Sequence, residues 1–232
     1  MLIIVDKKIP AEAKENLSKY GKLLNFSSSG ITYEAISGHP DIFFCKIGKE
    51  LIVAPNTPEE FTKELKNNGI SFKMGSRDVG GKYPDSAIYN AMVTDHHFVH
   101  NCDISDTMLL AKARQLKRIH INQGYCRCNL LLLKDNHFIT SDKGISKALI
   151  RQFFTGRYVA PDDVLLPGFD HGFLGGAMGV WQDKVFVIGN LDYLEKGKKI
   201  RKIVGALDYE LIELYDGPLF DGGSILFIPL IQ

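Results

Sequence analysis

The sequence has few of the features that mark a membrane-bound, secreted or nucleic-acid-binding protein. Its aliphatic runs, of which residues 130–133 are an example, have the length of a strand and are far too short to span a bilayer. The apolar stretch at residues 2–5 is likewise too short for the core of a signal peptide. The 28 basic and 27 acidic residues leave a formal net charge of +1, which argues against a protein built mainly to hold nucleic acid or an acidic membrane. These absences predict a cytoplasmic protein with no membrane partner.

Cysteine is also scarce, and the four residues, Cys45, Cys102, Cys126 and Cys128, are expected to be thiols in a reducing compartment. A chain of 232 residues can bury a sizeable core without a disulfide or a metal to hold it together. No Ser/Gly-rich linker, low-complexity tract or change of composition divides the chain. We therefore expect one domain over residues 1–232, with neither a cofactor nor a metal.

The sequence does contain a recurring order of signals. A short apolar strand that ends in Asn, Asp or Ser occurs at 2–6, 51–56, 98–101, 138–142 and 185–190. An amphipathic helical stretch follows each copy, at 10–20, 57–67, 105–116, 145–154 and 191–204. A second strand comes next, at 22–26, 71–74, 118–122, 163–166 and 210–215. The clearest of the helices is predicted to begin with Thr57 as its cap and Pro58 in its first turn.

A third strand precedes each copy and turns back through a hairpin. Four of the hairpin tips consist of residues that tolerate tight turns, at 48–49, 94–95, 134–136 and 182–183. The fifth hairpin has no tip, because its two strands are residues 225–231 and 2–5 at opposite ends of the chain. Pairing of these two strands would close the units into a ring. The sequence therefore predicts an α/β fold, a five-bladed propeller of ββαβ units with pseudo-fivefold symmetry, and an open α/β sheet is the alternative.

Units of this kind, joined between the chain ends, resemble the pentein superfamily, also known as the guanidino-group modifying enzyme fold. Within it, the chain is most similar to a compact bacterial branch. Relatives with deiminase activity carry a late Gly-Gly segment followed by a histidine and a nucleophilic cysteine. Gly222 and Gly223 match that segment, but Leu226 and Phe227 stand where the histidine and the cysteine are expected. The resemblance therefore implies a C–N hydrolase or an amidinotransferase only if the nucleophilic cysteine has moved to another position. The superfamily also includes a non-catalytic ribosome anti-association factor, so the resemblance equally allows a binding protein.

In a propeller of this kind, the loops that lead into the strands meet at one end of the axis. The residues just before these strands are Asp41, Asp85, Asn129, a small residue at 176–177, and Ser224, with Asp221 shortly before the last of them. Carboxylates at such a point suit a guanidinium, whose paired donors match two carboxylate oxygens. Asp41 and Asp85 each follow a proline, and Pro-Asp also simply starts a strand after a turn. The hypothesis is that Asp41, Asp85, Asn129, Asp221 and Ser224 bind a small cationic ligand.

The loop Cys126-Arg127-Cys128 is the most unusual in the sequence. A thiol beside an arginine ionises more easily, so Cys126 or Cys128 is a candidate nucleophile and Arg127 a candidate ligand-binding residue. Packing as small apolar residues would also explain both cysteines. Metal ligation is a third explanation, although no second Cys/His pair at a metal-binding spacing accompanies them.

A glycine-rich loop later in the chain holds Asp170 and His171. A histidine oriented by a carboxylate is a candidate acid/base if a nucleophile lies opposite. The alternative is a loop that needs unusual backbone angles and carries an incidental histidine.

Two functions remain open. The first is an axial pocket for a guanidino or amidino compound, with any hydrolysis performed by a relocated cysteine. The second is a non-catalytic binding protein. Basic stretches at 112–118 and 196–202 lie on predicted outer helices, but no aromatic ladder accompanies them, which disfavours a ribosome or nucleic-acid partner. We take the first function as the working hypothesis, because the residues that lead into the strands are more polar than a purely structural plug needs.

Overall fold

The computed structural model describes residues 1–230, whose strands form five three-stranded sheets and one two-stranded sheet. In spatial order, the three-stranded sheets are β17 (Leu226–Ile228), β1 (Leu2–Asp6) and β2 (Lys22–Phe26); β3 (Phe44–Ile47), β4 (Glu50–Val53) and β5 (Phe72–Met74); β6 (Met92–Val93), β7 (His97–His100) and β8 (Lys117–His120); β9 (Leu130–Leu133), β10 (His137–Thr140) and β11 (Thr155–Tyr158); and β13 (Met178–Trp181), β14 (Lys184–Val187) and β15 (Glu210–Glu213). In each sheet the middle strand pairs antiparallel with the first strand named and parallel with the last.

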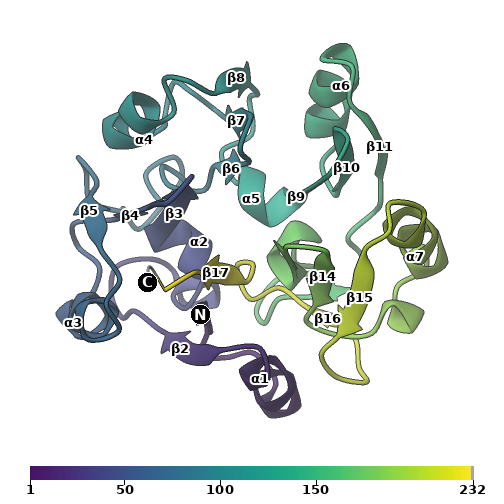
Figure 1. Ribbon diagram of the computed structural model, residues 1–232, viewed down its shortest axis with the longest axis horizontal. Coiled ribbons are helices and arrows are strands. Elements are labelled where there is room, and N and C mark those ends of the chain that lie inside the picture. The colour runs from purple at the N-terminus through teal and green to yellow at the C-terminus, as the bar shows by residue number, and fades with distance from the viewer. Residues whose placement is uncertain (231–232) are drawn as a thin grey trace.

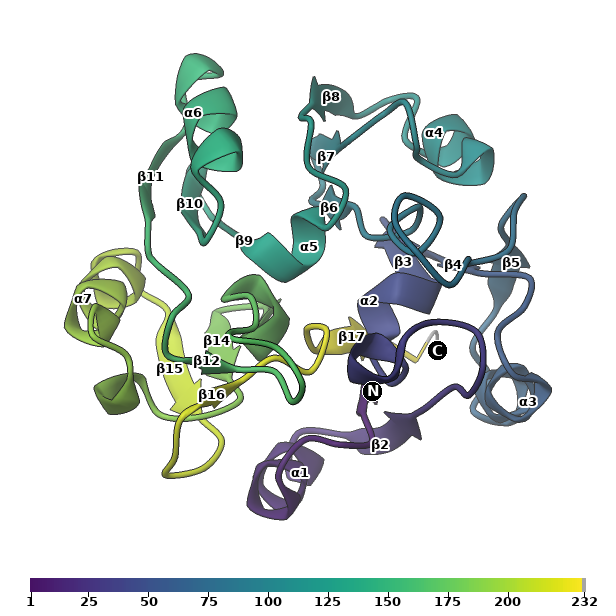
Figure 2. The same cartoon turned by 180° about the vertical axis from the view of Figure 1, so that it is seen from behind.

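A helix joins the middle strand of each sheet to its parallel neighbour. These helices are α1 (Ala11–Ser18), α3 (Glu59–Asn67), α4 (Thr107–Lys112), α6 (Lys143–Arg151) and α7 (Gly197–Ala206). Figure 1 shows them at the periphery of the molecule, with the short helices α2 (Pro40–Phe43) and α5 (Cys126–Asn129) near the middle, and Figure 2 shows the same arrangement from behind. Each long outer helix turns an apolar stripe inward, as α6 does with Ile145 and Leu149. Within residues 1–230, no helix has the length and the apolar character needed to cross a bilayer.

The first and last strands of the chain pair with each other. Leu2 lies opposite Ile228 and Ile4 opposite Leu226, in antiparallel register. This pairing confirms the predicted contact between the chain ends, although residue 231 of the predicted strand lies outside the described residues. No sheet within residues 1–230 closes on itself.

Two local predictions were wrong. The parallel strand of the fourth unit is β11, not residues 163–166, because β11 is an exposed edge strand of sequence TGRY that carries no apolar signal. Within 163–166, β12 (Val164–Leu165) instead pairs with β16 (Leu219–Phe220) in a separate two-stranded sheet. Thr57 does not cap α3: the residue before that helix is Pro58, and the Thr57 hydroxyl makes no hydrogen bond within residues 1–230.

Glycine lets two segments from distant parts of the chain approach at the centre. Gly176 belongs to the 3-10 helix η2 (Gly175–Ala177), and a Cβ on it would lie 1.9 Å from Asp221 Oδ1. The carbonyl oxygen of Gly176 accepts the backbone N–H groups of Gly222 at 3.1 Å and Ser224 at 2.8 Å. The backbone N–H of Asp41, in α2, bonds to the carbonyl of Gly223 at 3.3 Å. These contacts bring α2, η2 and the segment before β17 together around one buried polar cluster.

Candidate functional site

A pocket of about 240 Å3 lies against α2 and α5. Its apolar lining residues are Tyr33, Ile36, Ile42, Tyr125, Leu166, Phe169 and Phe173, and its polar ones are His39, Cys128, Asp170, His171 and Asp221. Within the described chain, neither lysine nor arginine lines this pocket. Below, "the central site" denotes Asp6, His39, Asp41, Cys128 and Asp221.

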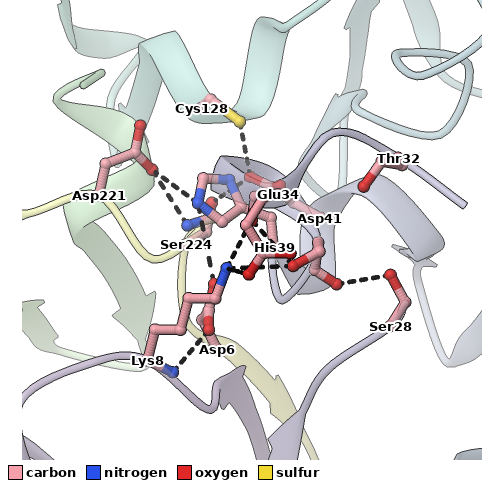
Figure 3. Close-up of polar contacts among 12 residues, drawn as sticks. Asp6, Lys8, Ser28, Thr32, Glu34, His39, Asp41, Cys128, Asp221 and Ser224 are labelled. Atoms are coloured by element: carbon pink, nitrogen blue, oxygen red, sulfur yellow. Dashed lines mark hydrogen bonds and ion pairs between the residues drawn. The ribbon is translucent and has the colours of Figure 1, made fainter. Parts of the chain in front are cut away.

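His39 lies between two carboxylates, as Figure 3 shows. Its Nε2 is 3.9 Å from both Asp6 Oδ2 and Asp221 Oδ1, too far for a hydrogen bond, and all three side chains are 1% exposed. Burial raises the pKa of both carboxyl groups, and a positive charge on His39 would oppose that rise. Asp221 is held in place by the backbone N–H groups of Phe173 at 2.8 Å and Gly223 at 3.0 Å.

The thiol of Cys128 belongs to a hydrogen-bonded group beside this histidine. Cys128 Sγ donates to Asp41 Oδ2 at 3.1 Å, and Ser224 Oγ donates to the same oxygen at 2.9 Å. Asn90 Nδ2 donates to Cys128 Sγ at 3.1 Å, while Asn90 Oδ1 accepts the backbone N–H of Cys128 at 3.2 Å. Burial, reinforced by the charges of Asp41 and Asp221, raises the pKa of Cys128 well above its ordinary value. The thiol is therefore protonated at neutral pH.

Several polar atoms of the central site have no hydrogen-bond partner among residues 1–230. They are Asp6 Oδ2, Asp41 Oδ1 and both ring nitrogens of His39. Unpaired buried atoms of this kind are rare in folded proteins unless water or a ligand completes their bonding. Three buried carboxylates also face a single histidine here, so the electrostatics of the site favour a cation.

His39, Asp41 and Cys128 have the chemistry of a metal site. All three residues are buried, and their candidate ligand atoms lie within 4.8 Å of one another. Imidazole, carboxylate and thiolate together suit Zn2+. The thiol proton is already donated to Asp41, which pairs two of the three candidate ligands with each other.

The structure brings six of the predicted site residues to this region. Asp41, Cys128 and Ser224 are hydrogen-bonded to one another, and Asp221 faces His39. Asp170 and His171 line the same pocket as Cys128. The ring of His171 is engaged locally, since its Nδ1 lies 2.9 Å from the carbonyl oxygen of Gly172.

The other four predicted residues lie elsewhere. Asp85 is exposed in a surface turn, so it takes no part in a polar ring at the centre. Cys126 is fully buried and donates to a backbone carbonyl. Asn129 donates to the carbonyl of Tyr125, just before its own helix, and accepts from the hydroxyl of Ser141. Arg127 lines two different cavities. Successive residues of one helical turn point in different directions, so adjacency to Cys128 in sequence does not carry these side chains into its pocket.

Asp6, His39 and Asn90 belong to this region and were missed by the sequence analysis. Asp6 is the polar residue that ends the first strand, the position at which the repeats show a recurring Asn, Asp or Ser. His39 directly precedes the Pro-Asp pair that drew attention to Asp41. Both signals were visible in the sequence, but neither indicates that the side chain is buried with polar atoms left unpaired.

Solved structures of the pentein type match this chain over nearly its whole length at low identity. A mutant of DDAH from Pseudomonas aeruginosa, in complex with citrulline, has a TM-score of 0.53 at 12% identity, over 91% of this chain and 91% of that one. The inosamine-phosphate amidinotransferase of Streptomyces griseus has a TM-score of 0.55 at 10% identity, over 94% and 78%. An agmatine deiminase from C. jejuni has a TM-score of 0.52 at 11% identity, over 92% and 87%. The protein therefore has a mixed α/β fold of the pentein type.

Comparison with curated proteins gives no match. A match to a sequence family extends over residues 4–226 and so includes every residue of the central site. The chain belongs to the Family of unknown function (DUF6873).

Proposed function

We propose that residues 1–232 form one pentein propeller with the five three-stranded sheets as its blades, and that its central site binds and hydrolyses a guanidino or amidino compound. The strand order repeated in every three-stranded sheet and the pairing of β1 with β17 support the propeller. The names of the matching structures, an amidinotransferase and an agmatine deiminase among them, support the class of compound.

The observation that carries the proposal is a buried thiol at an aromatic pocket, beside carboxylate and imidazole atoms that have no partner among residues 1–230. An amidinium is planar and cationic, so it would stack on the aromatic walls and direct its N–H donors at the carboxylates. Its charge would also lower the pKa of Cys128, which the carboxylates raise. Because no lysine or arginine of the described chain lines the pocket, a compound with an apolar substituent fits better than free arginine, whose carboxylate would be unpaired.

The hydrogen bond between Cys128 and Asp41 supports the following reaction. Asp41 accepts the proton of the Cys128 thiol, and the thiolate attacks the amidinium carbon to form a tetrahedral intermediate. His39 gives a proton to the departing nitrogen, so that the C–N bond breaks and the remaining amidine stays bonded to sulfur. Water then attacks that carbon and gives a proton back to His39. The C–S bond breaks, a urea or amide product leaves, and Asp41 returns its proton to the sulfur, which restores the thiol.

Calorimetric titration with phenylguanidinium, followed by assay of ammonia and aniline release, tests the proposal. We expect phenylguanidinium to bind more tightly than arginine and one of the two amines to be released. Cys128→Ser keeps a donor for Asp41 but no nucleophile, so it should retain binding and lose turnover. Cys126→Ser, two residues away in the same helix, is the matched control and should retain both. Absence of binding by phenylguanidinium, benzamidinium and agmatine alike would refute the proposal.

A non-catalytic binding protein is the second candidate, and the raised pKa of Cys128 favours it. A thiol that stays protonated even with the ligand bound would hold an amidine without attacking it. This candidate predicts that phenylguanidinium binds to the wild type and to Cys128→Ser with equal affinity and that neither protein releases an amine. Covalent adduct formation on Cys128, seen by intact mass spectrometry after acid quenching, would exclude it.

A further inference from the structure

Arg127 directly precedes Cys128, yet it lines cavities that share no residue with the pocket at Cys128. One cavity has a volume of about 490 Å3 and the other of about 130 Å3. Arg127, Thr94 and Val180 line both, so the two cavities adjoin around the guanidinium. We call this joint space the Arg127 cavity.

The guanidinium of Arg127 has almost no polar partner within the described chain. Its only hydrogen bond is from Nη2 to the carbonyl oxygen of Ile225 at 3.4 Å, and its buried Nε has none. Asp41 attracts it only at longer range, and burial lowers the pKa of Arg127. A partly buried guanidinium whose buried Nε has no partner is costly unless an anion completes its bonding.

A second cation adjoins Arg127. Lys46 lines the smaller cavity, with its Nζ 5.5 Å from the centroid of the Trp181 ring. Burial and the charge of Arg127 lower the pKa of Lys46, and Asp95 partly opposes that effect. The two carboxylates that line the Arg127 cavity, Asp95 and Asp135, are both exposed, whereas Arg127 is partly buried.

Part of the wall of the larger cavity is aliphatic, beside polar and charged residues such as His97 and Lys134. The apolar part includes Leu131 and Leu133 of β9, and Met178 and Val180 of β13. An inorganic anion would not contact this apolar part of the wall, whereas an alkyl chain would pack against it. The planar guanidinium presents paired donors that match the two oxygens of a carboxylate.

We propose that the Arg127 cavity is a second ligand site, which binds an aliphatic carboxylate with its head on Arg127 and its chain along β9 and β13. The larger cavity adjoins the central site at Ser224, whose hydroxyl donates to Asp41, but it shares no lining residue with the pocket at Cys128. The proposal does not depend on amidine chemistry. It accounts for the Arg127 guanidinium, whose donors are largely unpaired within residues 1–230.

Calorimetry with octanoate tests the proposal, with octan-1-ol as the neutral probe of the same length and octyl phosphate and inorganic phosphate as alternative anions. We expect wild-type protein to bind octanoate and not octan-1-ol, because the head group supplies the pairing. Arg127→Met should weaken octanoate binding at least about tenfold, and Arg127→Lys should weaken it less, since a single charge replaces the paired donors. The unliganded Arg127→Met protein should be at least as stable as wild type, because an unpaired buried cation is removed.

Val180→Trp provides a test that leaves the charge in place. The larger side chain would fill the space shared by the two cavities and should abolish octanoate binding while phenylguanidinium binding, measured separately, is unchanged. Equal octanoate affinity in wild type and Arg127→Met would overturn the proposal. So would tighter binding of inorganic phosphate than of octanoate, or binding of octan-1-ol as strong as that of octanoate. None of these results tests the amidine proposal, which is tested separately by the titration with phenylguanidinium, benzamidinium and agmatine.

Discussion

The molecule buries two histidines in opposite ways. His100 is fully satisfied: its Nδ1 lies 2.6 Å from Ser105 Oγ, and its Nε2 donates to the carbonyl oxygens of Ala87 at 3.1 Å and Gly124 at 2.8 Å. His39 is buried as completely, but neither ring nitrogen has a hydrogen-bond partner among residues 1–230. The comparison teaches that burial alone does not identify a functional histidine. A histidine that ties loops together has its bonding complete within the fold, whereas one that serves a ligand has bonding capacity left over.

The largest expected effect is the loss of the His100 ring. His100→Ala should lower the free energy of unfolding by about 3 kcal/mol, because it creates a cavity in the fold and removes the hydrogen bonds of the ring to two carbonyls and a hydroxyl. Urea denaturation at pH 7.5 measures the change. His39→Ala should lower the free energy of unfolding distinctly less than His100→Ala, since it breaks no hydrogen bond. Equal losses for the two variants would contradict the comparison.

The loss of stability at low pH that is due to His100 should be nearly as large as the loss in His100→Ala. Burial lowers the pKa of His100 from 6.5 to about 4. Since the folded value lies below the unfolded one, this stability is fully present above pH 6.5 and is lost as the pH falls towards 4, by about 3 kcal/mol at roughly 1.4 kcal/mol per pKa unit. Urea denaturation across this range should show the fall in wild type and its absence in His100→Gln. An equal fall in stability in wild type and in His100→Gln would show that other titratable groups cause it.

Asp6 should respond to pH with the opposite sign. Its pKa in the folded protein is raised above 3.8 by burial, so the folded state binds the proton more tightly and stability decreases as the pH rises through the folded pKa. Asp6→Asn keeps an acceptor for the Lys8 backbone N–H and removes this charge. We expect it to raise the free energy of unfolding by about 1 kcal/mol at pH 7, with the gain vanishing near pH 3.8, and to weaken phenylguanidinium binding. A loss of stability at pH 7 would mean that an ion pair with His39 outweighs the burial of the carboxylate.

Thiol reactivity extends the comparison to the two cysteines of α5. Cys128 lines a pocket, whereas Cys126 is sealed and donates to the Gln123 carbonyl. Iodoacetamide should modify Cys128 slowly and Cys126 not at all. Asp41→Asn should speed the reaction of Cys128 several-fold at pH 8, because the negative charge of Asp41 helps to raise the pKa of that thiol. Peptide mass mapping over time gives both rates, and faster labelling of Cys126 would reverse our assignment.

The smallest effect should come from Asp85. Asp85→Ala alters an exposed turn and should change the free energy of unfolding by no more than roughly 0.5 kcal/mol, with no effect on phenylguanidinium binding. Asp41→Ala, which leaves Cys128 Sγ and Ser224 Oγ without their acceptor, should reduce both the free energy of unfolding and the affinity for phenylguanidinium. The same denaturation and titration measurements apply to this pair. Loss of phenylguanidinium binding in Asp85→Ala would show that Asp85 does belong to the ligand site.

Asp41 and Asp85 also show where the sequence analysis reached its limit. Each follows a proline just before a predicted strand, and no local sequence feature distinguishes the two. In the structure, the backbone N–H of Asp41 is anchored to Gly223, which draws α2 to the centre. The backbone carbonyl of Asp85 instead accepts the backbone N–H of Gly80, which closes a local turn in an exposed loop. The difference depends on a partner from the other end of the chain.

The sequence by itself determined the order of strands and helices and the pairing of its two ends, because apolar periodicity and turn residues act over a few positions. It missed β11, whose exposed polar residues carry no such signal. Only the tertiary structure decided the central site, whose five residues come from four separated segments of the chain. Whether a buried polar atom is paired depends on neighbours that meet only in the folded protein, so no local pattern could distinguish His39 from His100.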